Sequence, residues 1–517
     1  MNFVQNRTTV LGFNDNWKPD LSNVTSTALD LKNDWNPRYI ILGIAALILF
    51  FIWTKSAELQ NPSRLPVIGR KWYELGYGKA RRRFQTGAPR LVKDCLEKYG
   101  DAFYLYTDSK FHLILSYKYA DAIRYDNRLS FMKAIQQKLN NGVHGFEPHA
   151  HMSSDKRFLR DMVKQVLTRS LASVIEPINS ECDDALRRNW SDSDESQEFM
   201  LKETMWKILG QIISKTYFND ESVHRNPEWI RLSTEYIKES FVAAHELRSW
   251  PKPIWGLVAN FHPRTKFVRR QLKQIRQLLK PFLLKLDEAK EGKESKTPIE
   301  WLHNAFQGQS PDIVSMIISL CMVSYDAGTE AVTHLISDLS GKDQLIHDLR
   351  AEILDVVGKE GFTKSSLQNL TLMDSVMKES QRLHPESYLL MQRQALEEVT
   401  LPDGIVIPKD TLLMISATHM MMDSSVWSDG DKFDGYRFFN LRQKSDKAAQ
   451  ASHYYVTTSP EQIAFGHGNQ ACAGRFFASY LIKIILCHIL LKYDFSVKAP
   501  EEGRSRIARI QLLRIRG

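Results

Sequence analysis

One segment constrains this chain more than any other: residues 465–475, FGHGNQACAGR, which directly precede an apolar run with helical character. It places a lone cysteine, Cys472, between glycines, and the backbone N–H groups at the start of the following helix would stabilise a negative sulfur. Gly468 and Gly474 would let the backbone approach a flat macrocycle closely, and Phe465 would shield the sulfur from water. The segment therefore predicts a thiolate ligand for haem iron; a small buried cysteine at a helix start is the alternative.

This segment resembles the ligand loop of the cytochrome P-450 family, and three further segments in the same order extend the resemblance over most of the chain after residue 62. The resemblance implies a cytochrome P-450 fold, mainly α with small β-sheets, and haem b with Cys472 as the axial ligand of its iron. Apolar runs at residues 102–106 and 112–115 predict short strands near its start.

The first of these segments is KESQRLHP, residues 378–385. Glu379 and Arg382 lie three residues apart and so share one face of a helix. Arg437 stands where the family places the third member of a buried Glu-Arg-Arg triad behind the haem. Without the resemblance, the same residues would be taken for solvated surface charges.

The second segment supplies a candidate partner for the haem propionates. In the family an arginine at the position of Arg393 reaches a propionate, and a planar guanidinium suits a carboxylate in a bidentate pair; a surface arginine is the alternative. Gln470 stands where Arg or His is common, and its neutral amide would donate without charge assistance. The tryptophan and arginine that many relatives use at the opposite haem edge are not evident, although His149, His151 and Arg157 lie in that region.

The third segment is a helix predicted over residues 313–339, which would cross the distal side of the haem. Its small Ala327-Gly328 pair would leave room for dioxygen. The acidic member of the family's usual acid–threonine pair matches Glu330, but Ala331 stands in the place of the threonine. The run that follows is also about one turn shorter than in relatives, so a locally distorted helix remains an alternative.

The loss of that threonine leaves proton delivery open. Thr329 or Thr333 would supply a hydroxyl after a small change of register, or the substrate's own hydroxyl would order the water. We therefore take Glu330 and Thr329 as candidate catalytic residues, with a plain helix-surface carboxylate as the alternative for Glu330.

The N-terminal region predicts a membrane anchor. Residues 39–53, YIILGIAALILFFIW, carry no charge, and they span about 22 Å as a helix against about 30 Å of hydrocarbon, a shortfall that flanking residues can cover. A cleaved signal peptide and a buried core helix are the alternatives. We expect a lumenal tail over residues 1–37, an anchor over 38–54, a proline-containing linker over 55–69 and a cytoplasmic haem domain over 70–517.

Charge and cysteine content agree with this organisation. Basic residues after the anchor favour a cytoplasmic catalytic part of a single-pass protein of the endoplasmic reticulum, and the sequons at Asn6 and Asn23 would be lumenal. The five cysteines show no paired spacing, which indicates a reducing compartment. The net charge of +9 comes without a nucleic-acid motif, so a membrane surface and an acidic redox partner explain it better. The stretch 250–257, WPKPIWGL, is apolar enough to enter lipid.

The resemblance is to fungal microsomal members that oxidise terpenoids and related secondary metabolites. It implies a monooxygenase that acts on a lipophilic substrate, with electrons from NADPH through a separate cytochrome P-450 reductase and cytochrome b5 as a further candidate donor. Two other classes remain: a haem-thiolate isomerase, dehydratase or peroxide-using enzyme, which Ala331 keeps open, and a haem-binding protein with little turnover.

Overall fold

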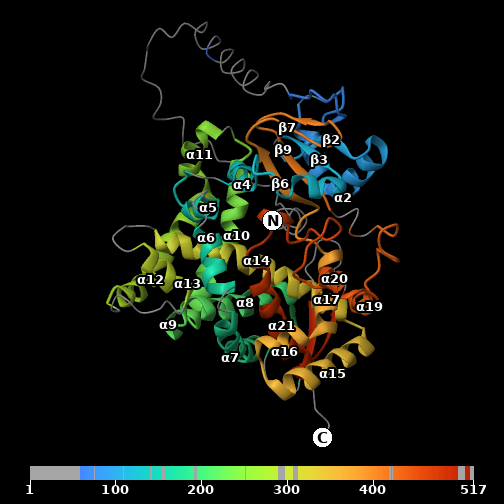
Figure 1. The fold of residues 1–517 in the computed structure, drawn as a ribbon. Helices are drawn as coiled ribbons and strands as arrows, with labels where there is room; N and C mark the ends of the chain where they lie inside the picture. Colours follow the sequence, from blue (N-terminus) through green and yellow to red (C-terminus); the bar gives the residue numbers. More distant parts are fainter. Residues whose placement is uncertain are drawn as a thin grey trace, which may run out of the picture.

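The computed structural model describes Gly43 and residues 59–512, apart from short gaps at 75, 109, 140–141, 154–157, 169–170, 191–194, 251, 289–296, 307–311, 418–420, 422 and 499–506 (Figure 1). The predicted lumenal tail, its two sequons and nearly all of the predicted anchor lie outside the described residues. What is described is mainly helical, with small sheets at two places, in agreement with the predicted fold class.

The largest sheet in the described part has the strand order β1-β2-β3-β9-β6-β4. Its strands are β1 (Val67–Ile68), β2 (Ala102–Tyr106), β3 (Phe111–Leu115), β9 (Leu412–Ser416), β6 (Leu389–Ala395) and β4 (Leu129–Ser130). β2 and β3 are the two predicted short strands. They pair antiparallel, and nearly all of their side chains are buried. A three-stranded sheet joins β10 (Tyr493–Lys498), β11 (Ile507–Leu512) and β5 (Gln197–Met200), and β7 (Val399–Thr400) pairs with β8 (Val406–Ile407).

The helices form the larger part of the molecule (Figure 1). In chain order they are α2 (Gly78–Tyr99), α3 (Ala120–Ile123), α4 (Phe131–Lys138), α5 (Glu147–Met152), α6 (Phe158–Met162), α7 (Leu171–Trp190), α8 (Leu201–Phe218), α9 (Glu221–His224), α10 (Pro227–Leu247), α11 (Trp255–Phe261), α12 (Pro263–Glu288), α13 (Pro298–Ala305), α14 (Ile313–Leu339), α15 (Asp343–Glu360), α16 (Lys364–Asn369), α17 (Thr371–Leu383), α19 (Arg437–Lys444), α20 (Lys447–Gln450) and α21 (Arg475–Lys492).

The long helix α14 runs through the core with the bounds that the sequence predicts, without a distortion at the shortened run. Asp312 caps its start by accepting a hydrogen bond from the Ser315 backbone N–H at 3.1 Å. It packs against α5, α8, α17 and α21. Among the described residues α14 is the helix with the length and apolar content of a membrane span, and most of it is buried in the protein.

Candidate active site

The cysteine loop is closed by backbone hydrogen bonds. The N–H of Cys472 donates to the carbonyl of Phe465 at 2.8 Å, and that of Ala471 donates to Gly468 at 3.1 Å. The Cys472 side chain has an exposed side, with protein around the rest of it. Burial raises the pKa of the Cys472 thiol, whereas the backbone N–H groups of Gly474 and Arg475, at the start of α21, lower it. The helix start thus favours the thiolate, as expected from the sequence.

Gly468 and Gly474 of the cysteine loop differ in backbone conformation and in surroundings. Gly468 has a φ of +73°, and a Cβ atom there would lie 2.5 Å from the carbonyl oxygen of Arg124, so this residue permits close contact with the end of α3. Gly474 has an ordinary φ of −87°, and a Cβ there would lie 3.9 Å from the Cys472 sulfur. Packing against Arg124 therefore gives a structural reason for Gly468, and the close approach of both glycines to a macrocycle stays a prediction.

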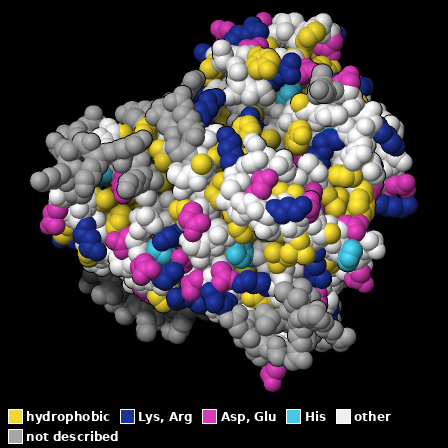
Figure 2. Space-filling view, turned by 60° about the horizontal axis from the view of Figure 1, so that its bottom comes forward, with side chains coloured by type: hydrophobic (Ala, Val, Ile, Leu, Met, Phe, Trp, Pro, Cys, Tyr) yellow, Lys and Arg dark blue, Asp and Glu magenta, His cyan; other side chains and the backbone are white. Residues whose placement is uncertain are grey.

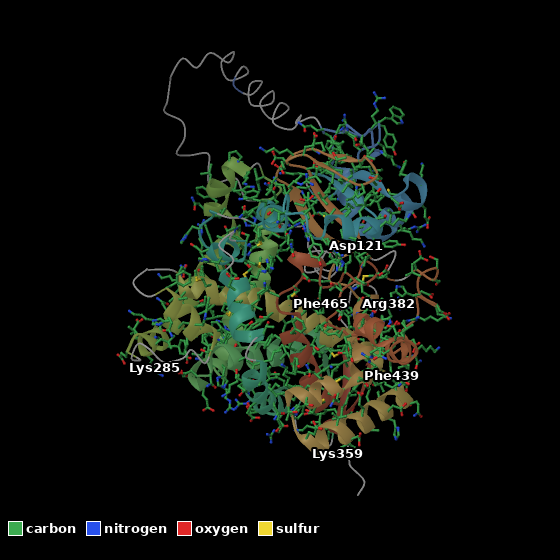
Figure 3. The ribbon with its side chains drawn as sticks, viewed as in Figure 1. Asp121, Lys285, Lys359, Arg382, Phe439 and Phe465 are labelled. Atoms are coloured by element: carbon green, nitrogen blue, oxygen red, sulfur yellow. The ribbon has the colours of Figure 1, made fainter. Side chains whose placement is uncertain are left out.

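The Glu-Arg-Arg triad is present in the structure. Glu379 and Arg382 are fully buried, and their side chains meet at 2.8 and 2.9 Å. Arg437 brings its Nε to 3.0 Å from the same carboxylate. Arg437 also donates from NH1 to the carbonyl of Ser428 at 2.6 Å. Arg382 donates from NH1 to the carbonyl of Gly430 at 2.6 Å. The triad therefore fixes the segment before α19, and Figure 3 shows Arg382 and the loop residue Phe465 in the central part of the molecule.

Two buried residues of α17 that sequence reasoning missed hold the segment that precedes the cysteine loop. Asp374 accepts from the backbone N–H of Tyr455 at 2.8 Å. The Lys378 ammonium donates to the carbonyls of Tyr454 and Thr457 at 2.8 and 2.9 Å. The ring of Tyr455 in turn packs edge-on against Phe465, with 5.2 Å between ring centroids. These contacts link α17 to the cysteine loop through a single short segment.

Asp374 is satisfied by cations on two other helices. Arg442 of α19 lies 3.1 Å from it and Lys483 of α21 lies 3.0 Å from it. Lys483 also donates to the carbonyl of Leu367 at 2.9 Å. Such a buried charge cluster is costly unless every member is paired, so we infer that it holds α17, α19 and α21 in one arrangement around the loop.

Lys378 gives a first test of this link. Lys378→Met removes both bonds to the segment, so we expect a smaller fraction of thiolate-ligated haem in the carbon-monoxide difference spectrum. The matched control is Arg350→Met, because Arg350 also bonds two main-chain carbonyls, those of Leu490 and Tyr493, at 2.7 and 3.1 Å. An equal spectral loss in both variants would reduce Lys378 to a general stabilising residue.

One stripe of α14 is accessible although the helix lies in the core. Val323 is 49% exposed, Ala327 is exposed and Ala331 is partly exposed, whereas Tyr325 and Thr329 have no exposed surface. Residues four apart share a helix face, so this apolar stripe borders open space. The distal helix therefore presents small or apolar side chains there.

The structure places the two candidate catalytic residues elsewhere on α14. Thr329 is two residues from Ala327, about 200° around the helix, and its hydroxyl is buried. Glu330 forms an ion pair with Lys202 of α8 and lies 3.6 Å from His334. Gly328 faces α8 as well, because a Cβ there would lie 2.7 Å from Leu209. Thr329 therefore does not lie on the accessible stripe, and Glu330 is held against α8 by its ion pair with Lys202.

A family model described as cytochrome P-450 matches residues 66–514 of the chain. The chain belongs to the cytochrome P-450 family. It is 37% identical over 467 residues to cytochrome P-450 monooxygenase esdpI of Penicillium shearii, which covers 88% of this chain and 89% of that protein. It is 35% identical to cytochrome P-450 monooxygenase adrA of Penicillium rubens, over 88% of this chain and 90% of that one. This P-450 is thus an enzyme of a haem-thiolate oxidoreductase family.

Solved structures agree on the fold. The retinoic acid-bound cyanobacterial protein CYP120A1 superimposes with a TM-score of 0.64 at 16% identity, over 87% of this chain and all of that chain. At this identity the likeness concerns the fold alone.

The residues of this P-450 fit a haem with its propionates. Arg393 is 1% exposed, and its Nε and one terminal nitrogen have no hydrogen-bond partner among the described residues. Burial lowers the pKa of Arg393 to about 10, and a propionate would supply the missing acceptor. Haem would supply the activation of dioxygen.

Two of the other propionate candidates, Gln470 and His149, have protein partners. The Gln470 side chain accepts from the Phe131 backbone N–H at 2.8 Å and donates to the Leu129 carbonyl at 2.9 Å, so it joins the loop to the start of α4 and keeps one amide hydrogen free of these bonds. The imidazole of His149 contacts the hydroxyl of Ser240 at 3.1 Å, and Arg157 lies outside the described residues.

Proposed function

We propose that this P-450 is a membrane-anchored monooxygenase that inserts one atom of dioxygen into a C–H bond of a lipophilic substrate. In this reaction substrate, dioxygen, NADPH and a proton give hydroxylated substrate, water and NADP⁺. The observation that carries the proposal is the exposed residue Cys472 in the loop just before α21, in a chain whose relatives are named monooxygenases. The apolar stripe of α14 favours a substrate with a hydrocarbon surface.

The finer parts of the proposal follow from the sequence. We place the substrate among terpenoids and related secondary metabolites, and we assign electron delivery to a separate NADPH-dependent reductase, with cytochrome b5 as a further candidate donor. On the face in Figure 2 basic and acidic side chains are interspersed, which favours a protein over a nucleic-acid partner there.

Exposed apolar side chains support attachment to the endoplasmic reticulum membrane. Trp72 is 95% exposed at the start of the described chain. Trp250, Leu257 and Phe261 are 51, 62 and 71% exposed at and before α11. Aromatic and aliphatic groups of this kind enter the interface of a bilayer, and the predicted anchor would bring them to it.

The test is conversion of a terpenoid panel by the full chain in membranes with reductase, NADPH and ¹⁸O₂. One labelled oxygen per product molecule, with NADPH consumed, supports the monooxygenase. Conversion without reductase or dioxygen would instead establish the isomerase or dehydratase class, which the absence of a hydroxyl on the described accessible stripe of α14 favours as the second candidate.

Proton delivery can be tested at two positions of the same helix. Ala331→Thr places a hydroxyl on the accessible stripe, so we expect a larger share of NADPH to end in product and a smaller share in hydrogen peroxide. Thr329→Val is the matched control, because that hydroxyl is buried away from the stripe, and it should leave the ratio unchanged. A fall in coupling for Thr329→Val alone would restore Thr329 as the proton donor.

A further inference from the structure

Cationic side chains from four parts of the chain lie near one another beside the end of α10, where Lys252 repels Lys110 and Arg248 repels Lys138. Arg81 lies on α2, Lys110 in the turn between β2 and β3, and Lys138 at the end of α4, while Arg248 and Lys252 follow α10. We call these five residues the cationic cluster.

Hydrogen bonds show how close two of these cations lie. Arg248 contacts Nδ1 of His245 at 2.9 Å, and Arg81 contacts Nε2 of the same ring at 3.5 Å. Arg81 also donates to the hydroxyl of Ser249 at 3.3 Å. Burial and both arginines together lower the pKa of His245 to about 4. A neutral imidazole therefore separates two guanidinium groups.

The described chain offsets the positive charge of the cluster only in part. None of its members forms an ion pair with a described residue, and the neighbouring carboxylate that acts on Lys138 and Arg248 is Asp108. Burial, with added repulsion from Arg248, lowers the pKa of Lys138 to about 8. The Nε of Arg248 is buried without a hydrogen-bond partner among the described residues. Like charges held together and partly desolvated cost free energy that a bound anion would offset.

Apolar groups adjoin the cluster. Trp250 follows Arg248 by two residues and is 51% exposed, and its carbonyl accepts from the indole of Trp255, the first residue of α11. Leu257 and Phe261 of α11 are exposed, and Figure 1 shows α11 and α4 at the same end of the molecule. An anion with attached acyl chains would satisfy both features.

We propose that the cationic cluster binds the phosphate group of an anionic phospholipid whose acyl chains lie against the apolar residues around α11. The inference rests on the membrane attachment proposed above. The shared chemistry is a phosphate oxygen held by guanidinium groups; the neighbouring apolar surface assigns it to a lipid rather than to free phosphate.

The test titrates the full chain in neutral detergent with dihexanoyl phosphatidic acid, dihexanoyl phosphatidylcholine and inorganic phosphate, and follows the unfolding midpoint. Saturable stabilisation is expected with phosphatidic acid at concentrations where the other two have little effect. Arg248→Gln should weaken this binding about tenfold through the loss of a charge-assisted bond. Arg82→Gln, next to Arg81 on α2 but exposed, is the matched control and should bind as the wild type does.

Equal weakening in the two variants, or equal binding of phosphatidylcholine, would overturn the site. Saturation by inorganic phosphate at the same concentration would overturn the lipid assignment. Sedimentation of the wild type with phosphatidylcholine vesicles checks membrane attachment separately, so that failure of the anchor is told apart from failure of the cluster.

Discussion

Cys472→Ala is expected to abolish the band at about 450 nm that thiolate-ligated haem gives in the carbon-monoxide difference spectrum. The mutation removes the sulfur at the start of α21, and no other cysteine among the described residues has an exposed side chain. The spectrum is recorded on reduced membranes containing the full chain. Activity should fall with the band.

Cys487→Ala is the matched control, because Cys487 is buried on α21, the helix that follows the Cys472 loop. This variant should keep the band, at some cost in stability from the vacated volume. A band that survived in Cys472→Ala and vanished in Cys487→Ala would contradict the ligand assignment. Loss in both, with both proteins folded, would point to the integrity of α21 instead.

Arg437→Ala should have the second large effect. It leaves Glu379 buried with Arg382 as its remaining charged partner, and removing one partner from a buried ion pair costs about 3–5 kcal/mol of unfolding free energy. It also releases the carbonyl of Ser428. We expect a lower unfolding midpoint in urea and little haem bound per polypeptide.

The comparison for Arg437 is Arg231→Ala. Arg231 pairs with two carboxylates, Glu228 and Glu235, each at 2.7 Å, whereas Arg437 pairs with Glu379, and the Arg231 side chain is 47% exposed. Surface pairs of this type contribute about 0–1 kcal/mol, so haem content should stay unchanged. Similar losses of stability for both arginines would show that burial of the triad is unimportant.

Much of the fold could be predicted because its signals are local or carried by the family resemblance. The bounds of α14, the strands β2 and β3, and the meeting of Glu379, Arg382 and Arg437 all follow from the sequence. Helical periodicity also contained a signal that was not used: Thr329 lies about 200° from Ala327.

The links around Asp374 and Lys378 could not be predicted in the same way. The groups that they hold in the segment 454–457 belong to the main chain, about eighty residues further along the chain. Every residue has a backbone carbonyl, so a hydrogen bond to one leaves no motif in the sequence. The partners of Gln470, which are also main-chain groups of a distant segment, were missed for the same reason.

These links bear on biosynthesis. The segment 454–457 is held by Lys378 of α17 and by Arg475 of α21, whose Nε donates to the carbonyl of Val456 at 3.1 Å. A nascent chain that has emerged from the ribosome only as far as α17 contains Lys378 but not Arg475. We therefore expect haem to bind late in synthesis. The loop 465–475 should take its final conformation only after α21 has been synthesised.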